Sequence, residues 1–324
     1  MITATSMMYI YTETPLHAGV GSGLSSVELP IQRERHTQYP MIQGSSIKGK
    51  LRALIADQCG SNSDRRVKAL FGHERETQET DQLHAGALIV GDARILLFPV
   101  RSLQGVFAYT TSFDVLERFR KDLIHVHQEQ TFPQLPSTRL KNGQALVTEQ
   151  SEVITSQSGP GLLLEEFSFE VSRSQQVTSV AHWLAEHALP FDGYWADKLQ
   201  HSLVVLADDD FRDFVLYSTE VITRIAIDQE KKTVKEGALW TEEHLPTDTL
   251  LYAPIYATNE RRPSEQGQVP RQGLELLQEA QALSQQAGAG PYLQLGGDET
   301  VGRGFVKVRW SPPVPLTGSA TGRP

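Results

Sequence analysis

Two residue types that carry out proton transfer flank a glycine-rich stretch near the N-terminus. His17 and Glu28 lie on either side of Gly19-Val20-Gly21-Ser22-Gly23. A carboxylate or an imidazole can deprotonate a hydroxyl nucleophile such as the 2′-hydroxyl of RNA, and nearby cations or a divalent metal can stabilise the charge at phosphorus. Because a single histidine or glutamate is more often structural, the spacing alone leaves both interpretations open.

A basic cluster follows directly, although the chain as a whole is acidic. Its members are Arg33, Arg35, Lys48, Lys50 and Arg52. Gly44-Ser45-Ser46 opens a segment with helical periodicity, which predicts a helix over 45–58 with Ser45 as its N-cap. Free backbone N–H groups at a helix start, together with Lys and Arg side chains, bind phosphate groups. The alternative is a solvated surface with ordinary charge pairs.

Two glycine motifs suggest a mononucleotide site, but neither is complete. The first stretch is GxGxG rather than GxGxxG, and no regular helix pattern follows it. Gly297 and Gly302 have the first spacing of a P-loop, but Arg303-Gly304 replaces the Lys-Ser/Thr pair and a predicted strand follows. We interpret the second motif as a turn between strands, where Arg303 could still contact phosphate.

Composition limits the remaining possibilities. The chain has 324 residues, a net charge of -9 and one cysteine, Cys59, which excludes an internal disulfide and a cysteine-rich zinc site. It has neither an apolar run of about 18 residues nor the pattern of a secretory signal, so no membrane partner and a cytoplasmic location are expected. The acidic balance argues against indiscriminate nucleic-acid binding but permits a local basic groove.

The hydrophobic patterns predict an α+β protein. Residues 1–125 give the order β-α-β-β-α, most of a ferredoxin-like unit, with strands over 7–14, 87–100 and 105–112 and helices over 45–58 and 114–125. Further strands are expected over 161–172, 220–228, 238–246, 249–258, 291–294 and 305–310, and helices over 65–71, 179–188, 208–217 and 270–287. Glu242-Glu243-His244 would then lie at a solvated hairpin end, and residues 311–324 form a disordered tail.

Five segments together resemble one known family. They are PLHAGVGSG, LPIQRERHTQYPMIQGSSIKGKLR, DARILLFPV, ALWTEEHLP and LGGDETVGRGFV. The chain is similar, from about Tyr9 to Val308, to the RAMP-type backbone subunits of the type III-B CRISPR effector, the Cmr complex. The resemblance implies one RRM-like (ferredoxin-like) domain over 1–310, with a β-hairpin thumb over about 219–246, lid-like segments over about 61–86 and 133–180, and a Gly-rich C-terminal loop.

The resemblance also implies an activity and partners. Several copies would stack head to tail along the guide crRNA and, with other subunits, cut a complementary target RNA at regular intervals in a reaction that needs Mg²⁺ or Mn²⁺. Such a heterologous interface does not close and therefore builds a helical filament. Base pairing would supply sequence recognition, so this protein would need only backbone contacts and shape.

The family's functional residues map onto particular positions. The loop histidine corresponds to His17, and the catalytic aspartate, tentatively also the metal ligand, corresponds to Glu28. A Glu–Tyr pair corresponds to Glu242 and His244. The guide-binding elements correspond to the motif that begins at Ser45, Ser46 and Lys48 and to the loop containing Gly297 and Arg303, and Arg33, Arg35, Lys50 and Arg52 would add phosphate contacts.

Two of these positions depart from the family pattern. Glu28 has one methylene more than aspartate, and a displacement of about 1 Å at a reacting group can slow a reaction on the order of 10²-fold. His244 stands where the family has tyrosine. The sequence therefore leaves two alternatives open: a scaffold that binds RNA without cutting it, and a nuclease that processes the guide precursor.

Overall fold

The computed structural model describes residues 1–23, 27–73, 84–136, 139–155, 161–228, 230–261, 269–286 and 291–316. Parts of the two expected lid segments, at 74–83, 137–138 and 156–160, lie outside the described residues, as do residues 317–324 of the expected tail.

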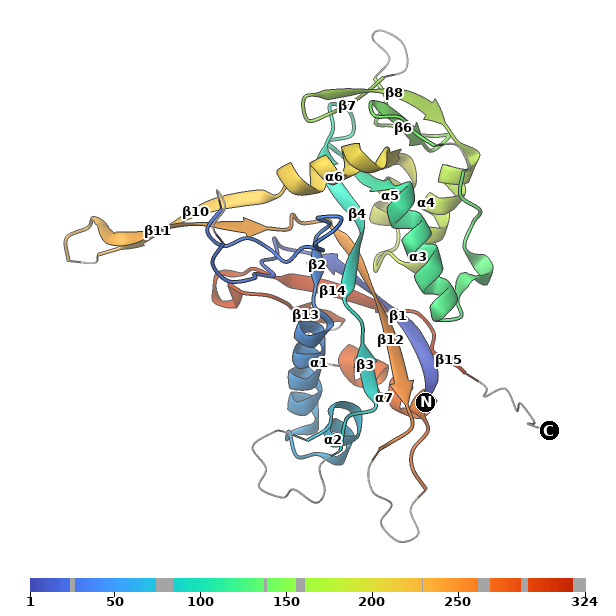
Figure 1. Ribbon diagram of the computed structural model, residues 1–324, viewed down its shortest axis with the longest axis vertical. Coiled ribbons are helices and arrows are strands. Elements are labelled where there is room, and N and C mark those ends of the chain that lie inside the picture. Colours follow the sequence, from blue (N-terminus) through green and yellow to red (C-terminus); the bar gives the residue numbers. More distant parts are fainter. Residues whose placement is uncertain are drawn as a thin grey trace.

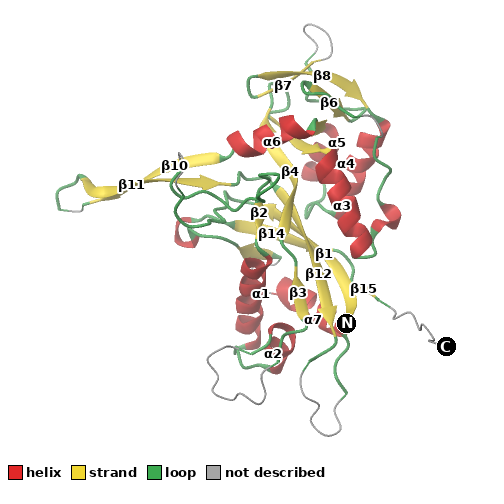
Figure 2. Ribbon diagram, viewed as in Figure 1, coloured by secondary structure: helices red, strands yellow, loops and turns green. Residues whose placement is uncertain are grey.

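The secondary structure is mixed, as predicted (Figure 2). The helices are α1 (Gly44–Cys59), α2 (Arg65–Phe71), α3 (Phe113–His125), α4 (Gln175–His187), α5 (Tyr194–Ser202), α6 (Asp208–Tyr217) and α7 (Gly273–Gln286). The strands are β1 (Ile2–Thr12), β2 (Met41–Ile42), β3 (Leu88–Val90), β4 (Ala93–Arg101), β5 (Phe107–Ser112), β6 (Gln144–Val147), β7 (Gly161–Leu164), β8 (Phe167–Arg173), β9 (Leu203–Leu206), β10 (Glu220–Ile227), β11 (Val234–His244), β12 (Leu250–Thr258), β13 (Tyr292–Gln294), β14 (Phe305–Trp310) and β15 (Val314–Pro315).

One large sheet runs through the molecule, and β1 is the third strand from one of its edges (Figure 1). Its order is β13-β14-β1-β12-β4-β5-β9-β6-β8-β7, and β1 pairs antiparallel with β12 on one side and β14 on the other. Helix α7 packs on β1 and β12, and α1 packs on α7 and β3. Along the chain, β1, α1, β4, β12, α7 and β14 follow the β-α-β-β-α-β order of a ferredoxin-like unit.

The expectation that residues 1–125 supply most of that unit is wrong. Strand β5 pairs with β4 and β9 at a distance from β1, and α3 packs on β4 and β5. The second half of the unit comes instead from β12, α7 and β14, late in the chain. Local patterns identified the strands, but their pairing depends on contacts between distant segments.

Three local expectations also need correction. The segment 161–172 is not one strand but the hairpin β7–β8, which turns at Glu165 with φ 49°. Helix α1 begins one residue before Ser45, and its N-cap residue is Gln43, which makes no side-chain cap. The expected tail begins with ordered structure, because β15 pairs with β1 and Ser311 donates its backbone N–H to Met7.

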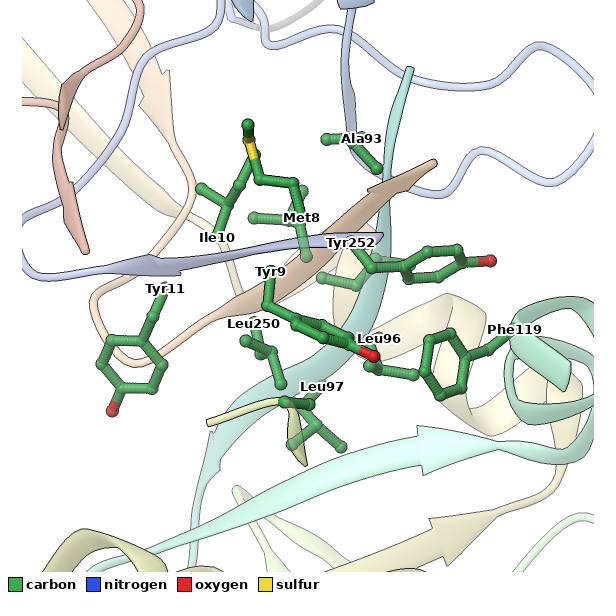
Figure 3. Packing of buried hydrophobic residues seen from close by; sticks show 14 of the residues in the cluster. Met8, Tyr9, Ile10, Tyr11, Ala93, Leu96, Leu97, Phe119, Leu250 and Tyr252 are labelled. Atoms are coloured by element: carbon green, nitrogen blue, oxygen red, sulfur yellow. The ribbon is translucent and has the colours of Figure 1, made fainter. Parts of the chain in front are cut away.

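Between the core strands and the outer helices lies an aromatic cluster (Figure 3). Phe119 of α3 is fully buried, and its ring meets those of Tyr9, Tyr252, Trp183 and Phe132 edge-on. Edge-to-face packing adds to the free energy gained by burying these large rings. The cluster fixes β1 and β12 against the helical layer and so fixes the platform that carries the loops described below.

Strands β10 and β11 form a separate two-stranded hairpin that projects away from the main sheet (Figure 1). They coincide with the hairpin expected over 219–246. Within the expected lid segments, the described parts include α2 and the strands β6 to β8, which continue the main sheet. None of the described helices combines the length and the apolar character needed to cross a membrane.

We expect Phe119→Ala to lower the free energy of unfolding by about 3–5 kcal/mol, because it leaves a cavity among four aromatic rings. Phe167→Ala is the matched control, since that ring is 57% exposed and its loss should cost below about 1 kcal/mol. Urea unfolding monitored by circular dichroism measures both. An equal decrease in the free energy of unfolding for the two variants would show that the Phe119 cluster does not stabilise the fold.

Candidate active site and RNA-binding surface

Three segments distant in sequence meet at the base of the hairpin. Leu16 pairs with Leu245, just after β11, through backbone hydrogen bonds in both directions. The glycine-rich loop 295–304 joins them, because Gly297 donates its N–H to the carbonyl of His17 and Gly304 donates to the carbonyl of Pro15. The predicted residues His17, Gly297 and His244 therefore lie in one place.

The His17 imidazole is held in a defined tautomer. Its Nδ1 lies 2.7 Å from the backbone oxygen of Glu243, and because a carbonyl only accepts, Nδ1 carries the proton and Nε2 is left as the acceptor. A Cβ at Gly19 would lie 2.5 Å from Nε2, so glycine leaves room for the ring. The first glycine of the GxGxG stretch thus serves His17, not a nucleotide.

Glu28 lies on the same hairpin base, at the surface. Its carboxylate accepts the backbone N–H of Thr241 at 3.1 Å, and its own N–H donates to the Thr241 hydroxyl at 3.0 Å. Leu29 forms a parallel bridge with Glu242. The loop carrying Glu28 thus pairs with β11, with Leu29 opposite Glu242 and Glu28 beside Thr241.

A buried carboxylate locks this loop to the hairpin. Glu243 is 6% exposed; its Oε1 lies 2.5 Å from Arg33 and accepts the Thr219 hydroxyl, and its Oε2 accepts the Ile31 N–H. Arg33 also donates to the backbone oxygens of Gln38 and Val215. The guanidinium expected to hold phosphate is thus engaged within the protein.

On the other face of β11, Glu242 and His244 point into a polar cluster. Glu242 is 5% exposed and accepts hydrogen bonds from Arg224 at 2.8 Å and Trp240 at 2.7 Å. Burial alone would raise the pKa of Glu242, but these hydrogen bonds outweigh it and lower the pKa, so the group is ionised. Asp298 of the glycine-rich loop accepts from Arg224 at 3.2 Å.

His244 completes this cluster. Its side chain has no exposed surface, and its Nε2 lies 3.4 Å from Asp298 and 3.9 Å from Glu242. Its ring centroid is 5.4 Å from that of His17. Burial, followed by the nearby His17, lowers the pKa of His244, so the ring is neutral at pH 7. The expectation of a solvated hairpin end at Glu242–His244 is therefore wrong.

The other predicted phosphate-binding residues differ in how exposed they are and in whether they are engaged by other groups of the protein. Ser45 and Ser46 are exposed in the first turn of α1, and Arg35 is exposed and makes no ion pair within the described part of the chain. Lys48 donates to the carbonyl of Leu88, and burial lowers its pKa. Lys50 pairs with the exposed Glu299 at 3.3 Å, a contact that solvent weakens.

Arg303 and Arg52 complete the set of predicted phosphate-binding cations. Arg303 is partly buried, 3.9 Å from Glu220 of β10, where burial raises the Glu220 pKa and Arg303 opposes the rise. Arg52 lies on α1, one helical turn after Lys48, as predicted.

Sequence reasoning missed several residues that build the site. Arg224, Trp240 and Asp298 surround Glu242, and Gln32 joins the loop to α1 by accepting the Gln43 N–H and donating to the Gly19 carbonyl. Asp298 stands inside the quoted glycine motif, which was a usable signal. Arg224 pairs with Trp240 across the hairpin, a register that the charged turn alone did not specify.

An α+β fold with buried acidic and imidazole groups, an exposed carboxylate and basic residues near a helix start has the groups that binding and cutting a phosphodiester backbone require. The model of the RAMP superfamily matches residues 9–307. The chain is 38% identical over 304 residues to the CRISPR system Cmr endoribonuclease Cmr4 of Pyrococcus furiosus, covering 92% of this chain and 93% of that protein. The protein therefore belongs to the RAMP superfamily and, within it, to the Cmr4 family.

Solved structures give the same result for the fold. The crystal structure of oligomeric Cmr4 from Pyrococcus furiosus superposes with a TM-score of 0.69 at 33% identity, covering 98% of this chain and all of that one. A chain of the cryo-EM structure of the type III-B Cmr-beta bound to cognate target RNA superposes with a TM-score of 0.67 at 22% identity, covering 94% and 96%. The second likeness concerns the fold alone.

We expect Gly304→Ala to displace the glycine-rich loop and lower the free energy of unfolding by several kcal/mol. Its φ is 75°, and an added Cβ would collide with the carbonyl oxygen of Leu295. Gly302→Ala is the control: φ is 79°, but the space around it is open, so only the backbone penalty of about 1–2 kcal/mol applies. Urea unfolding distinguishes them, and equal effects would contradict the close approach.

Proposed function

We propose that this protein is the target-cutting backbone subunit of a type III-B CRISPR effector complex. It binds guide crRNA in several adjacent copies, assembles with the other subunits, and cleaves the complementary target RNA as an endoribonuclease. The observation that carries the proposal is the meeting of Glu28, His17, Glu242 and His244 at the base of one projecting hairpin. The Cmr4 relatives, one of them titled as oligomeric, support it.

The guide is held by its backbone. The first turn of α1 offers the exposed Ser45 and Ser46, and Arg35 and Lys50 add charge beside it. Arg303, Lys48 and Arg52 complete this basic surface, and Gly297 lets the loop approach closely. Contacts of this kind position a nucleic acid without reading its sequence, which base pairing with the guide supplies.

The hairpin acts as a thumb at the guide–target duplex. An isolated two-stranded hairpin is marginally stable in water. Its exposed apolar side chains, at about half exposure each, need a partner to cover them: Val221, Ile225, Ile227, Val234 and Leu239. Bases of the duplex or the next copy of the chain would pack on these side chains. Because head-to-tail stacking is a heterologous interface that does not close, further copies can add at the end.

Cleavage uses the target's own 2′-hydroxyl. Glu28, exposed and oriented by Thr241, accepts the proton of that hydroxyl. His17 orients the target by accepting a hydrogen bond at Nε2, or, once Nε2 has also taken up a proton, protonates the leaving 5′-oxygen. Glu242 and His244 support these groups from the hairpin base. A divalent ion, Mg²⁺ or Mn²⁺, would stabilise charge at the phosphate when bound.

The ligand atoms that could hold such an ion together belong to residues other than Glu28. Glu242, His244 and Asp298 offer ligand atoms within 4.8 Å of one another, whereas Glu28 belongs to no such group within the described residues. Glu28 as a metal ligand thus stays a prediction, to be judged against its role as a base.

We expect Glu28→Ala to lower target cleavage by about 10²-fold or more, with guide binding unchanged, because a general base contributes on that order. The measurement assembles the complex with guide RNA, adds end-labelled complementary RNA with Mg²⁺ or Mn²⁺, and follows a regular ladder of products. Glu28→Asp is the matched variant: a faster ladder would show that the longer side chain limits the wild type.

Three results would overturn parts of this proposal. Target binding without a ladder in wild type and in Glu28→Asp would make the subunit a scaffold. An unchanged ladder in Glu28→Ala would remove Glu28 from the chemistry. Cleavage of precursor RNA but not of target RNA would make the protein a guide-processing nuclease.

We expect deletion of Glu230 to Lys235, at the hairpin tip, to disturb target positioning or cutting while guide binding persists. The tip projects from the body and contributes nothing to the core, so the fold should survive. Filter binding with guide RNA and the ladder assay measure the two properties separately. Unchanged cutting would show that the hairpin is no thumb.

A further inference from the structure

His244 has hydrogen-bonding capacity that the protein does not use. Its side chain is completely buried, yet neither ring nitrogen has a hydrogen-bond partner among the described residues. Buried polar atoms in native proteins are almost always paired, and each exception calls for a reason, such as an ion. The ring is aimed at two carboxylates, Asp298 and Glu242.

The spacing of these three groups suits a bound ion. Protein ligands lie about 2.0–2.2 Å from a transition metal, so two ligands of one ion lie about 3–4 Å apart. His244 Nε2 is 3.4 Å from Asp298 Oδ2 and 3.9 Å from Glu242 Oε2. Little movement would bring all three onto one ion.

Arg224 shows that the two carboxylates can hold a cation between them. Its guanidinium contacts both carboxylates, at 2.8 Å to Glu242 and 3.2 Å to Asp298. One guanidinium thus faces two carboxylates, so the cluster contains more acidic than cationic side chains. Both Arg224 and Asp298 are about one-quarter exposed, which leaves a route for an ion and for the arginine to move away.

The geometry points to a divalent transition-metal site formed by Glu242, His244 and Asp298, with Mn²⁺ preferred over Mg²⁺ and with Arg224 as a competing resident cation. Imidazole is a ligand for transition metals, whereas Mg²⁺ favours oxygen ligands and retains its waters. The inference rests on the proposed function only for its use in catalysis, since ion binding can be measured without RNA.

We expect Mn²⁺ to raise the melting temperature of the wild-type chain and to bind at least tenfold more tightly than Mg²⁺. Asp298→Asn should weaken Mn²⁺ binding at least tenfold, and His244→Ala should do the same. His201→Ala is the control, because this histidine lies on α5, away from the cluster. Isothermal titration of the purified full chain gives the affinities.

Arg224→Gln separates competition from simple structural support. Without metal this variant should melt at a lower temperature, because it leaves two carboxylates unpaired. With Mn²⁺ it should recover, and it should bind the ion more tightly than wild type does. Spin-echo modulation of bound Mn²⁺ should show a directly bound imidazole nitrogen that disappears in His244→Ala, even if that variant binds weakly.

The outcomes are separable from those of the ladder assay. Equal effects of Mn²⁺ on wild type, Asp298→Asn and Arg224→Gln, or the absence of a nitrogen signal, would overturn the site while leaving RNA cleavage to stand on its own assay. Mn²⁺ binding with all the expected variant effects would support the site even if no ladder formed.

Discussion

The buried carboxylate of Glu243 is the interaction on which the functional region depends. It joins Arg33 and Ile31 of the loop after the glycines to β11 and to Thr219 at the start of the hairpin, and Arg33 extends the link to Val215 of α6. Removing one partner of a buried ion pair typically costs about 3–5 kcal/mol, because the other charge stays buried. Without this ion pair and its hydrogen bonds, the loop that carries Glu28 would not be held in a fixed position relative to the hairpin base.

Side chains along β11 alternate between its two faces, so the three consecutive polar residues of its end make contacts on both faces. Side chains of neighbouring residues in a strand point to opposite faces. Glu243 therefore turns toward Arg33 and anchors the loop, while Glu242 and His244 turn toward Arg224 and Asp298. A run of charged residues that suggests a solvated strand end is instead buried on both faces, because a separate segment packs on each.

Local sequence patterns determined the elements better than their assembly. Helices α1 and α2 form within one residue of their predicted bounds, whereas β1 covers Ile2–Thr12 instead of the predicted 7–14. The pairing of β1 with β12 and β14 could not be predicted from the first half, because it depends on strands encoded more than 200 residues later. Likewise, the charges of Arg33 and Lys48 were evident, but their inward hydrogen bonds to Val215 and Leu88 depend on the folded surroundings.

The acidic composition and the RNA-binding role are compatible because several acidic groups near the site face arginines of the same chain. Glu243 faces Arg33, Glu34 faces Arg118, and Glu242 with Asp298 faces Arg224. Arg35 and the two serines of the first turn of α1 stay exposed. A phosphate backbone approaching these residues therefore meets a local positive field, since at physiological salt charges more than about 8 Å away are largely screened.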